Sequence, residues 1–441
     1  MFAYYLALAV RSFRRNKLLT ALMVLTIGFG VAASMTTWSV FRAVSGDPIP
    51  QKSSELFVPQ IDVWGPAGRA PGSKSTEPQA ALDYTDAVAL MRAHRAKYQS
   101  AMYQIADSVM PKGNYQRLTA ATGEAVSSAF FPMFDVPFKY GSGWSAADDK
   151  DRARIVVISS RLNTALFGGG DSVGRVLAFG HHDYRVVGVT DHWHPQPVFY
   201  DVVNSGGFND TAGNIFMPFN TAVASDISPS GTTNCYKPPT GAGFKGLRHS
   251  ACVWVAFMVQ LDGAAAVRDY HQFLVNYAAE QRQIGRFDWP PNVRLRGLMD
   301  WLAFRQVVPP DTEISLYVAL GLLLVCLVNV MGLLLAKFMR RRGEIGVRRA
   351  LGASRAQIYA QFTVESGMVG LAGGAVGLVL TALGVAAIGW VMPRDIAVLA
   401  TFNVPLFIST LVVAVVATIV VGLYPTFRAA RVQPAWQLKS N

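Results

Sequence analysis

The chain has 441 residues, of which 51% are hydrophobic and only 15% are charged. A soluble globular protein carries about 25% charged residues, so this composition excludes an ordinary soluble protein and favours a membrane protein of two or three domains. The net charge of +12 suggests a nucleic-acid partner, but residues 46–313 carry 24 basic against 25 acidic side chains. The positive excess lies in the rest of the chain, and we expect no nucleic-acid partner.

The first apolar stretch lies near the N-terminus. Leu18–Phe41 has about 24 residues and no charged side chain, which is long enough to cross a bilayer. It is also longer than the apolar core of a signal peptide, so a transmembrane helix over residues 18–45 is favoured over cleavage near Ala33. Residues 1–17 carry four basic side chains and are expected to form a cytoplasmic amphipathic helix.

A large insertion follows over residues 46–313, with the irregular order of strand and helix patterns that is typical of an α+β domain. We expect it to contain two subdomains. Near its start, residues 83–98 have helical spacing, with an apolar face that includes Val88, Met91 and Tyr98.

Further along, residues 153–191 predict a strand, a short helix, a glycine-rich turn and two strands, and residues 253–283 predict a strand followed by a helix. Cys235 and Cys252 flank a loop rich in Gly, Pro, Ser and Thr. Outside the cytoplasm a disulfide between them can persist, and two unpaired buried thiols are the alternative. Cys326, in a later apolar stretch, is expected to be a small core residue.

Four of the seven histidines lie within fourteen residues, which brings a metal site into consideration. They are His181, His182, His192 and His194. The predicted strand between the two pairs holds them roughly 25 Å apart, and two ligands are too few for a structural zinc site. The pattern G-x-S-x-G occurs once, at Gly170–Gly174, but this stretch belongs to the predicted glycine-rich turn and does not join a strand to a following helix, as a nucleophile elbow does. The chain has no G-x-x-x-x-G-K-[ST] phosphate loop. We therefore expect no catalytic residue, metal or cofactor on this chain, and no enzyme.

Three more apolar stretches follow the insertion. They predict transmembrane helices over residues 314–336, 367–392 and 404–423, with a short periplasmic loop over 393–403 and a cytoplasmic tail over 424–441. Outside the insertion the chain carries 16 basic and 3 acidic residues, most of them beside these spans. Because basic flanks stay in the cytoplasm, we expect both termini inside and the insertion outside. The apolar stretches contain no charge, which favours a membrane part that transmits movement over one that conducts a solute.

Small residues recur in the third span at spacings of three and four, which places them along one helix face. They include Gly367, Gly370, Gly374, Gly377 and Gly384. Such a face lets helices approach closely, either within one chain or between subunits, and both alternatives stay open. In the second span, Asn329 is the one strongly polar group and is expected to form a helix–helix hydrogen bond.

The segment over residues 337–366 is short, strongly basic and patterned for structure. Ser354 and Gln357 have the spacing of a capping box, so the third helix is expected to begin at Arg355. Glu344 and Arg348 are spaced for an i,i+4 ion pair. We expect a short helix with exposed apolar residues, Ile345, Val347 and Leu351, that docks onto a protein. The alternative is that the basic residues only fix topology and bind anionic lipid.

Several of these segments resemble those of the MacB/FtsX-type ABC transporter permeases. The resemblance is carried by "RRGEIGVRRALGASRAQI" at residues 341–358, "YPTFRAARVQPAWQLKS" at 424–440, "ARIVVISSRLNTALFGGGDSVGRVLAFGHHDYRVVGV" at 153–189 and "ALAVRSFRRNKLLTALMVLTIGFGVA" at 7–32. It covers essentially the whole chain. The tail departs from the family pattern at Ala435, Trp436 and Gln437, and the segment between the two outer cysteines has no family counterpart.

The resemblance implies a permease subunit of an ABC transporter in the inner membrane. No fused ATPase domain is recognised, so ATP and Mg are expected on a separate ATPase partner. The further partners expected are a second permease copy or a related permease, membrane lipid and a periplasmic adaptor. ATP hydrolysis would drive periplasmic movement for export or efflux. A membrane-anchored periplasmic receptor or scaffold without ATP coupling is the alternative function. The residues that match the family's ATPase-coupling segment are Glu344, Ile345, Gly346, Arg348, Leu351, Gly352 and Ser354.

Overall fold

The computed structural model separates the chain into two compact units, a helical unit formed by Met1–Gly46 and Pro309–Asn441 and an inserted domain formed by Asp47–Val308. The predicted loop over 393–403 and the tail beyond residue 430 lie outside the described residues. The structure describes residues 2–69, 75–113, 118–208, 213–239, 241–308, 310–391 and 404–430.

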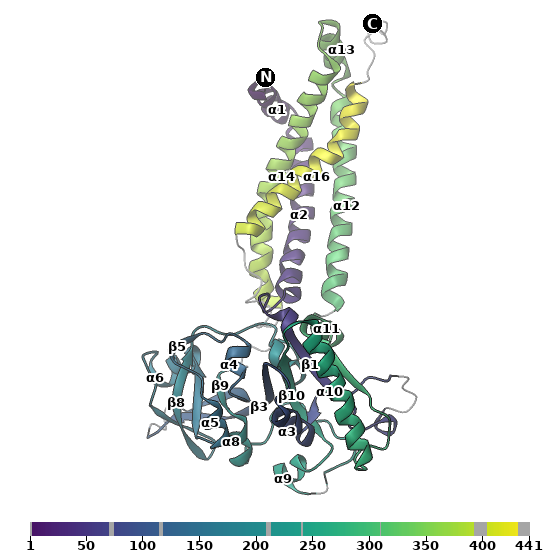
Figure 1. Ribbon diagram of the computed structural model, residues 1–441. Helices are drawn as coiled ribbons and strands as arrows, with labels where there is room; N and C mark the ends of the chain where they lie inside the picture. Colours follow the sequence, from purple (N-terminus) through teal and green to yellow (C-terminus); the bar gives the residue numbers. More distant parts are fainter. Residues whose placement is uncertain are drawn as a thin grey trace. The chain divides into compact units, whose positions relative to one another are not determined.

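Four long helices lie side by side in the helical unit (Figure 1). Each contains a segment that is long and apolar enough to cross a membrane, judged by length and composition. Helix α14 packs against α2 and α16, and α12 packs against the same two helices. The helices of this unit are α1 (Phe2–Arg15), α2 (Lys17–Ser45), α12 (Pro310–Met339), α13 (Arg342–Ala350), α14 (Arg355–Val391) and α16 (Val404–Ala430).

The long helices extend beyond the apolar stretches that predicted them. Helix α14 begins at Arg355, as the capping box predicted: the Ser354 Oγ accepts a hydrogen bond from the Gln357 backbone N–H, and the Gln357 Oε1 accepts one from the Ser354 N–H. Cys326 is buried on α12, where its sulfur would lie 3.1 Å from a Cβ placed on Gly30 of α2. Its predicted role as a small core residue is confirmed.

Glycines in α14 give its neighbours close access to the helix backbone. A Cβ atom on Gly370 would lie 2.9 Å from the Val415 Cα of α16, whereas a Cβ on Gly367 would meet only the Ile419 side chain at 3.6 Å. Gly374 also faces α16, but Gly377 and Gly384 face α2. The predicted stripe therefore divides between two neighbours within the chain.

The inserted domain is built on one 11-stranded sheet with the order β11-β1-β10-β3-β4-β9-β6-β8-β5, in which β2 pairs with β10 and β7 pairs with β3 and β8. Its two predicted subdomains therefore share one sheet. The strands are β1 (Leu56–Ile61), β2 (Leu82–Asp83), β3 (Tyr98–Pro111), β4 (Thr119–Val126), β5 (Phe138–Gly141), β6 (Ile155–Ser159), β7 (Val176–Phe179), β8 (His182–Thr190), β9 (Ile215–Pro218), β10 (Val253–Gln260) and β11 (Val293–Gly297).

Strand β10 lies between β1 and β3, and each of its residues is buried, which explains its nearly continuous apolar sequence. The order predicted for residues 153–191 is confirmed by β6, α6, β7 and β8, and that for 253–283 by β10 and α10. The helices of the domain are α3 (Tyr84–Ala93), α4 (Phe130–Met133), α5 (Ala146–Lys150), α6 (Ser160–Phe167), α7 (Val202–Ser205), α8 (Phe219–Ala224), α9 (Gly243–Arg248), α10 (Gly263–Gln283) and α11 (Leu298–Phe304).

The helix predicted over residues 83–98 ends earlier than expected. Helix α3 stops at Ala93 because His94 takes a left-handed conformation (φ 46°), and Tyr98 already belongs to β3. The residues of α3 that reach the core are Asp86, Ala87 and Leu90. Val88 and Met91, which the spacing placed on one apolar face of the helix, are only half-buried.

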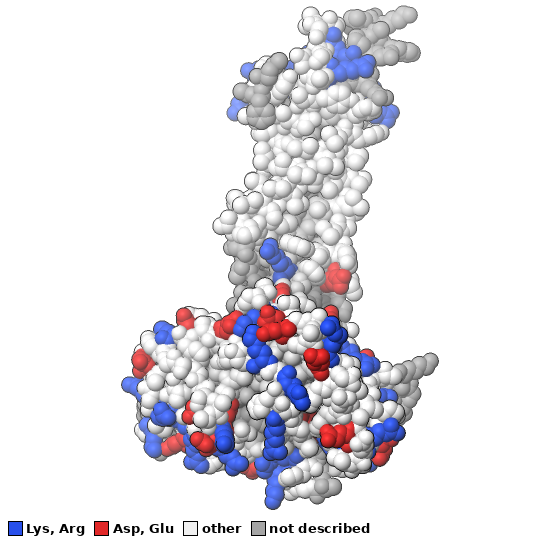
Figure 2. Space-filling view, in the orientation of Figure 1, with Lys and Arg blue, Asp and Glu red and all other residues white. Residues whose placement is uncertain are grey.

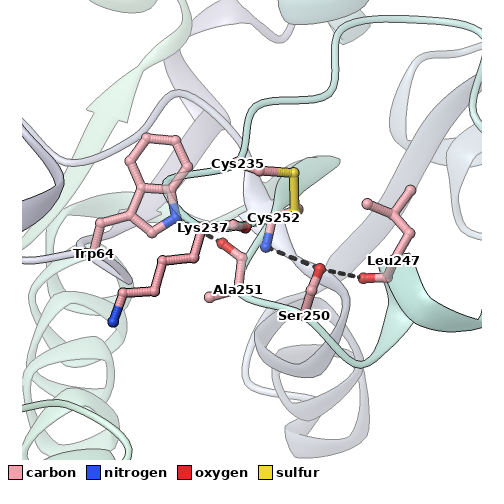
Figure 3. The surroundings of a disulfide bond; sticks show 7 residues. All are labelled: Trp64, Cys235, Lys237, Leu247, Ser250, Ala251 and Cys252. Atoms are coloured by element: carbon pink, nitrogen blue, oxygen red, sulfur yellow. Dashed lines mark hydrogen bonds between the residues drawn. A yellow bond between two sulfur atoms is a disulfide. The ribbon is translucent and has the colours of Figure 1, made fainter. Parts of the chain in front are cut away.

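A disulfide joins Cys235 in an irregular segment to Cys252, the residue before β10 (Figure 3). Cys252 is fully buried, and its backbone N–H donates a hydrogen bond to the Ser250 Oγ. Beside the bond, the Trp64 Nε1 donates to the Ala251 carbonyl oxygen. The disulfide thus fastens an irregular loop to the start of β10 in the sheet.

We predict that replacing both Cys235 and Cys252 with alanine lowers the free energy of unfolding by roughly 3 kcal/mol, since the bond closes a loop with a sequence separation of 17. Thermal or denaturant unfolding of the purified protein measures the change. Thiol alkylation provides the control: native protein should react at these two positions only after a reductant is added. Reaction without a reductant would show that the bond is absent.

The glycine contacts give a matched pair of substitutions in α14. Gly370→Ala should lower the stability of the detergent-solubilised protein by roughly 1–3 kcal/mol, because its methyl group overlaps the backbone of α16. Gly367→Ala adds the same methyl group at an ordinary van der Waals distance and should leave the unfolding temperature nearly unchanged. Equal effects of the two substitutions would contradict the described packing of α14 on α16.

Candidate coupling site in the basic loop

The basic segment between α12 and α14 is a structured loop. Helix α13 covers Arg342–Ala350, which confirms the predicted short helix. The chain then turns at Gly352, whose φ of +97° is a left-handed conformation that glycine adopts without a steric penalty. The cap at Ser354 begins the next helix directly. On the face shown in Figure 2, Lys and Arg gather at the end of the helical unit that carries α13.

Only part of the predicted apolar docking face is exposed. The exposed fractions of Val347 and Leu351 are 59% and 83%, but Ile345 is 3% exposed and packs in the core of the helical unit. The expectation that Ile345 is exposed is wrong, because residues two apart in a helix point in nearly opposite directions. Gly346 is also buried. Leu351 and Val347 are therefore the apolar side chains that a partner can reach.

Glu344 is held by two arginines on either side of it in the sequence. The predicted i,i+4 pair is present, with 2.7 Å between the Arg348 Nη2 and the Glu344 Oε1. Arg341 also donates to both carboxylate oxygens at 2.9 Å. These hydrogen bonds from Arg341 lower the pKa of Glu344, so its carboxylate stays charged at neutral pH. Glu344 thus organises α13 and is not free to pair with a partner.

A second carboxylate, Glu365 of α14, lies beneath the loop and is 1% exposed. Its Oε2 accepts a hydrogen bond from the Arg341 Nη1 at 3.1 Å, and its Oε1 lies 2.8 Å from the Nζ of the buried Lys337 of α12. The hydroxyl of Ser12, on α1, donates to the same Oε1. Glu365 therefore receives cations or donors from three other segments of the chain.

Two further contacts extend this network, which we call the Glu365 network. The Arg348 Nη1 donates to the Gln361 Oε1 of α14 at 2.8 Å, so α13 has a second polar link to that helix. The Lys337 Nζ lies 5.0 Å from the centre of the Phe13 ring, close enough for a cation–π contact with α1. The network consequently joins α13 to α1, α12 and α14.

Sequence reasoning identified the loop but missed the residues beneath it. The predicted span over residues 314–336 ends just before Lys337, and the span over 367–392 begins just after Glu365. Neither charged residue was therefore included in a predicted span. The available signal was Glu365 itself, since it is the only acidic residue in the 37-residue α14. A single acid beside a long apolar stretch implies a buried partner, because an unpaired charge there is costly.

The predicted site residues thus fall into three groups. Glu344 and Arg348 belong to the Glu365 network, Gly352 and Ser354 shape the turn and the cap, and Leu351 is exposed to a partner. The four histidines considered for a metal site do not contribute here, and across the residues that the structure describes no group of three metal-ligating side chains occurs.

We predict that Glu365→Gln lowers the free energy of unfolding by roughly 3–5 kcal/mol, since it leaves the buried Lys337 without a counter-charge. Glu344→Gln, in a half-exposed pair, should lower it by about 1 kcal/mol or less. The double change Lys337→Met with Glu365→Leu should be milder than Glu365→Gln alone, because an apolar pair leaves no isolated charge. Unfolding in detergent measures all three, and an equal loss for both glutamines would contradict a buried network.

Comparison with known proteins gives the family. A model of the MacB-like periplasmic core domain matches residues 20–270, and a model of the FtsX-like permease C-terminal region matches residues 316–434. The macrolide export ATP-binding/permease protein MacB 1/2 of Paracoccus denitrificans is 25% identical over 451 residues, which cover 99% of this chain and 58% of that protein. The pyoverdine export ATP-binding/permease protein PvdT of Pseudomonas entomophila is 27% identical, over 71% of this chain and 42% of that protein.

The chain thus spans about half the length of these relatives, 58% of the first and 42% of the second. Among solved structures, the periplasmic region of MacB from Actinobacillus actinomycetemcomitans is similar, with 12% identity, a TM-score of 0.36 and coverage of 59% of this chain and 96% of that one. The two family models together match most of the chain in the expected order, and the second match begins within the second span. The chain belongs to the MacB/FtsX-type family of ABC transporter permeases.

Proposed function

We propose that this chain is the permease subunit of an ABC exporter that couples ATP hydrolysis by a separate ATPase to movement of the inserted domain outside the membrane. The family supports a role in ABC-type export, and the names of two relatives include both an ATP-binding and a permease function. ATP and Mg would be held by the ATPase partner.

The Glu365 network is the observation that carries this proposal. A partner that presses on the exposed Leu351 acts on a helix that is tied to the bundle by Arg341 and Arg348. Because breaking a buried ion pair costs about 3–5 kcal/mol, the loop resists moving separately from the bundle. A displacement of α13 would therefore be passed to α1, α12 and α14.

The proposed orientation places the basic loop and both termini in the cytoplasm and the inserted domain outside. The charge distribution supports it, with 16 basic and 3 acidic residues outside residues 46–313. The Cys235–Cys252 disulfide supports it as well, because such bonds persist in oxidising compartments. The ATPase would then meet the loop on the side of the membrane where ATP is available.

We further propose that the permease works as a pair, with a second copy or a related permease. Asn329 lies exposed on α12 among apolar residues, and its side-chain amide has no hydrogen bond within the described part of the chain. The hydrogen bond to another helix that was expected of it is therefore not formed among these residues. In lipid, an amide without a partner is unfavourable, and a second helix can supply the missing hydrogen bond. A periplasmic adaptor, which the family resemblance implies, would bind the inserted domain.

We predict that Leu351→Glu releases the ATPase without destabilising the permease, since this side chain is 83% exposed. The native complex is purified through a tag on the permease, and the amount of P-loop ATPase subunit that co-purifies is measured by quantitative mass spectrometry. At least a tenfold loss of that subunit is expected, because burying a charge in an apolar contact costs about 1.4 kcal/mol or more.

The matched control is Leu118→Glu, the same change at another exposed leucine, outside the loop. This variant should retain a stoichiometric ATPase subunit. If the wild-type protein brings down no P-loop subunit, the receptor or scaffold function replaces the exporter. If Leu351→Glu keeps its ATPase in full, the docking role of the loop is wrong.

A further inference from the structure

The outer face of helix α3 in the inserted domain is apolar and is only partly covered by protein. Tyr84, Val88 and Met91 follow the spacing of one helix face and are half-buried, whereas the helix reaches the core through Ala87 and Leu90. All three line a cavity. This apolar face therefore borders an open space.

This cavity has a volume of about 860 Å³, within the range of roughly 300–1,000 Å³ that is common for small-molecule sites. Its other wall comes from the segment after β4, from α5 and from the start of α8, with Ser128, Ala129, Ala146 and Asn220 among its residues. A smaller hollow of about 430 Å³ shares several of these residues and adds Trp144. The two together form a cleft with room for a compact organic molecule.

The floor of the cleft is already ordered. The Tyr84 ring stacks on Phe219 with 6.3 Å between ring centres and on Trp254 with 6.1 Å. Tyr84 therefore needs little reordering to receive an apolar ligand, which favours binding because less side-chain entropy is lost. The adjacent Val88 and Met91 continue this apolar surface.

The rim of the cleft is positively charged. Arg92, Lys150 and Arg152 line it, and none has a carboxylate partner within the described part of the chain. A fourth cation, Lys97, is paired with Asp262 at 2.9 Å. Three cations from two facing walls are thus available to one ligand.

One carboxylate, Asp149, also lines the cleft, but its charge is engaged within the protein. Its Oδ2 accepts a hydrogen bond from the Ser128 N–H at 2.6 Å, and its Oδ1 accepts one from the Trp144 Nε1 at 3.0 Å. Burial raises the pKa of Asp149. The cleft therefore presents a net positive potential to a ligand.

Two rim residues adopt left-handed backbone conformations although neither is glycine. These are His94, with φ 46°, and Arg152, with φ 56°. Such conformations are unfavourable by about 1–3 kcal/mol each and tend to gather at ligand sites. The left-handed His94 ends α3 on one wall, and the left-handed Arg152 turns the chain after α5 on the other wall. Each of these turns thus forms part of one wall of the cleft.

We propose that this cleft binds an anionic amphiphile, a small molecule with a carboxylate, phosphate or sulfate group and an aromatic or aliphatic body. The anion would pair with Arg92, Lys150 and Arg152, and the body would lie on Tyr84 and Val88. A simple inorganic anion leaves the apolar floor unused, and a cationic molecule meets the rim with like charge. The binding site is independent of the coupling loop.

The test uses the full-length protein in a neutral detergent and isothermal titration calorimetry with three water-soluble probes. 1-Naphthyl phosphate carries both features, inorganic phosphate carries only the anion, and 1-naphthylmethylammonium carries the same ring system with a positive charge. The first should bind at one site per chain and at least about tenfold more tightly than either of the others. Its affinity should fall as salt is added.

Variants assign the binding to the cleft. Arg92→Gln with Lys150→Gln should weaken 1-naphthyl phosphate binding at least about tenfold by removing one cation from each wall. Val88→Asn should weaken it through the floor while leaving the weak binding of inorganic phosphate unchanged. Lys139→Gln is the control, since it removes an exposed lysine that does not line the cleft.

Three results would overturn the proposal. The first is a failure of 1-naphthyl phosphate to bind at millimolar concentration, and the second is equal binding of the anionic and cationic naphthyl probes. The third is an equal effect of the double Gln variant and Lys139→Gln. Because ATPase co-purification is measured separately, none of these results bears on the proposed coupling function.

Discussion

The helical unit depends on how it neutralises one buried carboxylate, that of Glu365. Lys337 and Arg341 supply the opposite charge from α12 and from the residue before α13, and Ser12 adds a hydroxyl donor from α1. An isolated charge at this depth would be strongly destabilising, so these segments must stay together for the bundle to fold. Because Arg341 belongs to the loop, the same ion pairs also hold the loop against the bundle. The contacts that stabilise the bundle can therefore also transmit movement from the loop to the helices, as proposed.

The arrangement of the loop follows from this constraint. Glu344 lies between Arg341 and Arg348, and Arg341 reaches both Glu344 and Glu365. Arg341 is therefore the residue that links the surface of the loop to its base. Its guanidinium group suits this position, because it can form several hydrogen bonds in one plane, which an ammonium group cannot. The exposed Leu351 lies one residue beyond α13, where a partner can reach it.

Local patterns predicted the local structure of this protein well. The capping box at Ser354, the ion pair of Glu344 with Arg348 and the strand and helix order of residues 153–191 each depend on neighbours in the sequence, and each is present in the structure. Features that depend on distant segments were missed. Nothing near Glu365 in the sequence indicates that Lys337 and Ser12 meet it.

Two placements of apolar side chains have related causes. Ile345 was expected at the surface because a short basic loop suggested exposure, but helical periodicity turns it toward the core. Val88 and Met91 were predicted on one apolar helix face, and they are only half-buried because they border a cleft. In both cases hydrophobicity alone did not decide burial. The position of the neighbouring segment decided it.

The central claim is that movement of the loop reaches the inserted domain through the Glu365 network. Hydrogen–deuterium exchange of residues 47–308 tests it, in the purified complex with its ATPase, with and without ATP and vanadate. Arg341→Gln combined with Gln361→Ala removes both polar links from the loop to α14, while leaving Glu365 paired with Lys337 and Glu344 paired with Arg348. The account predicts that the nucleotide changes the exchange of the inserted domain in the wild-type complex and that the change is much smaller in the variant. An equal change in both complexes would contradict it.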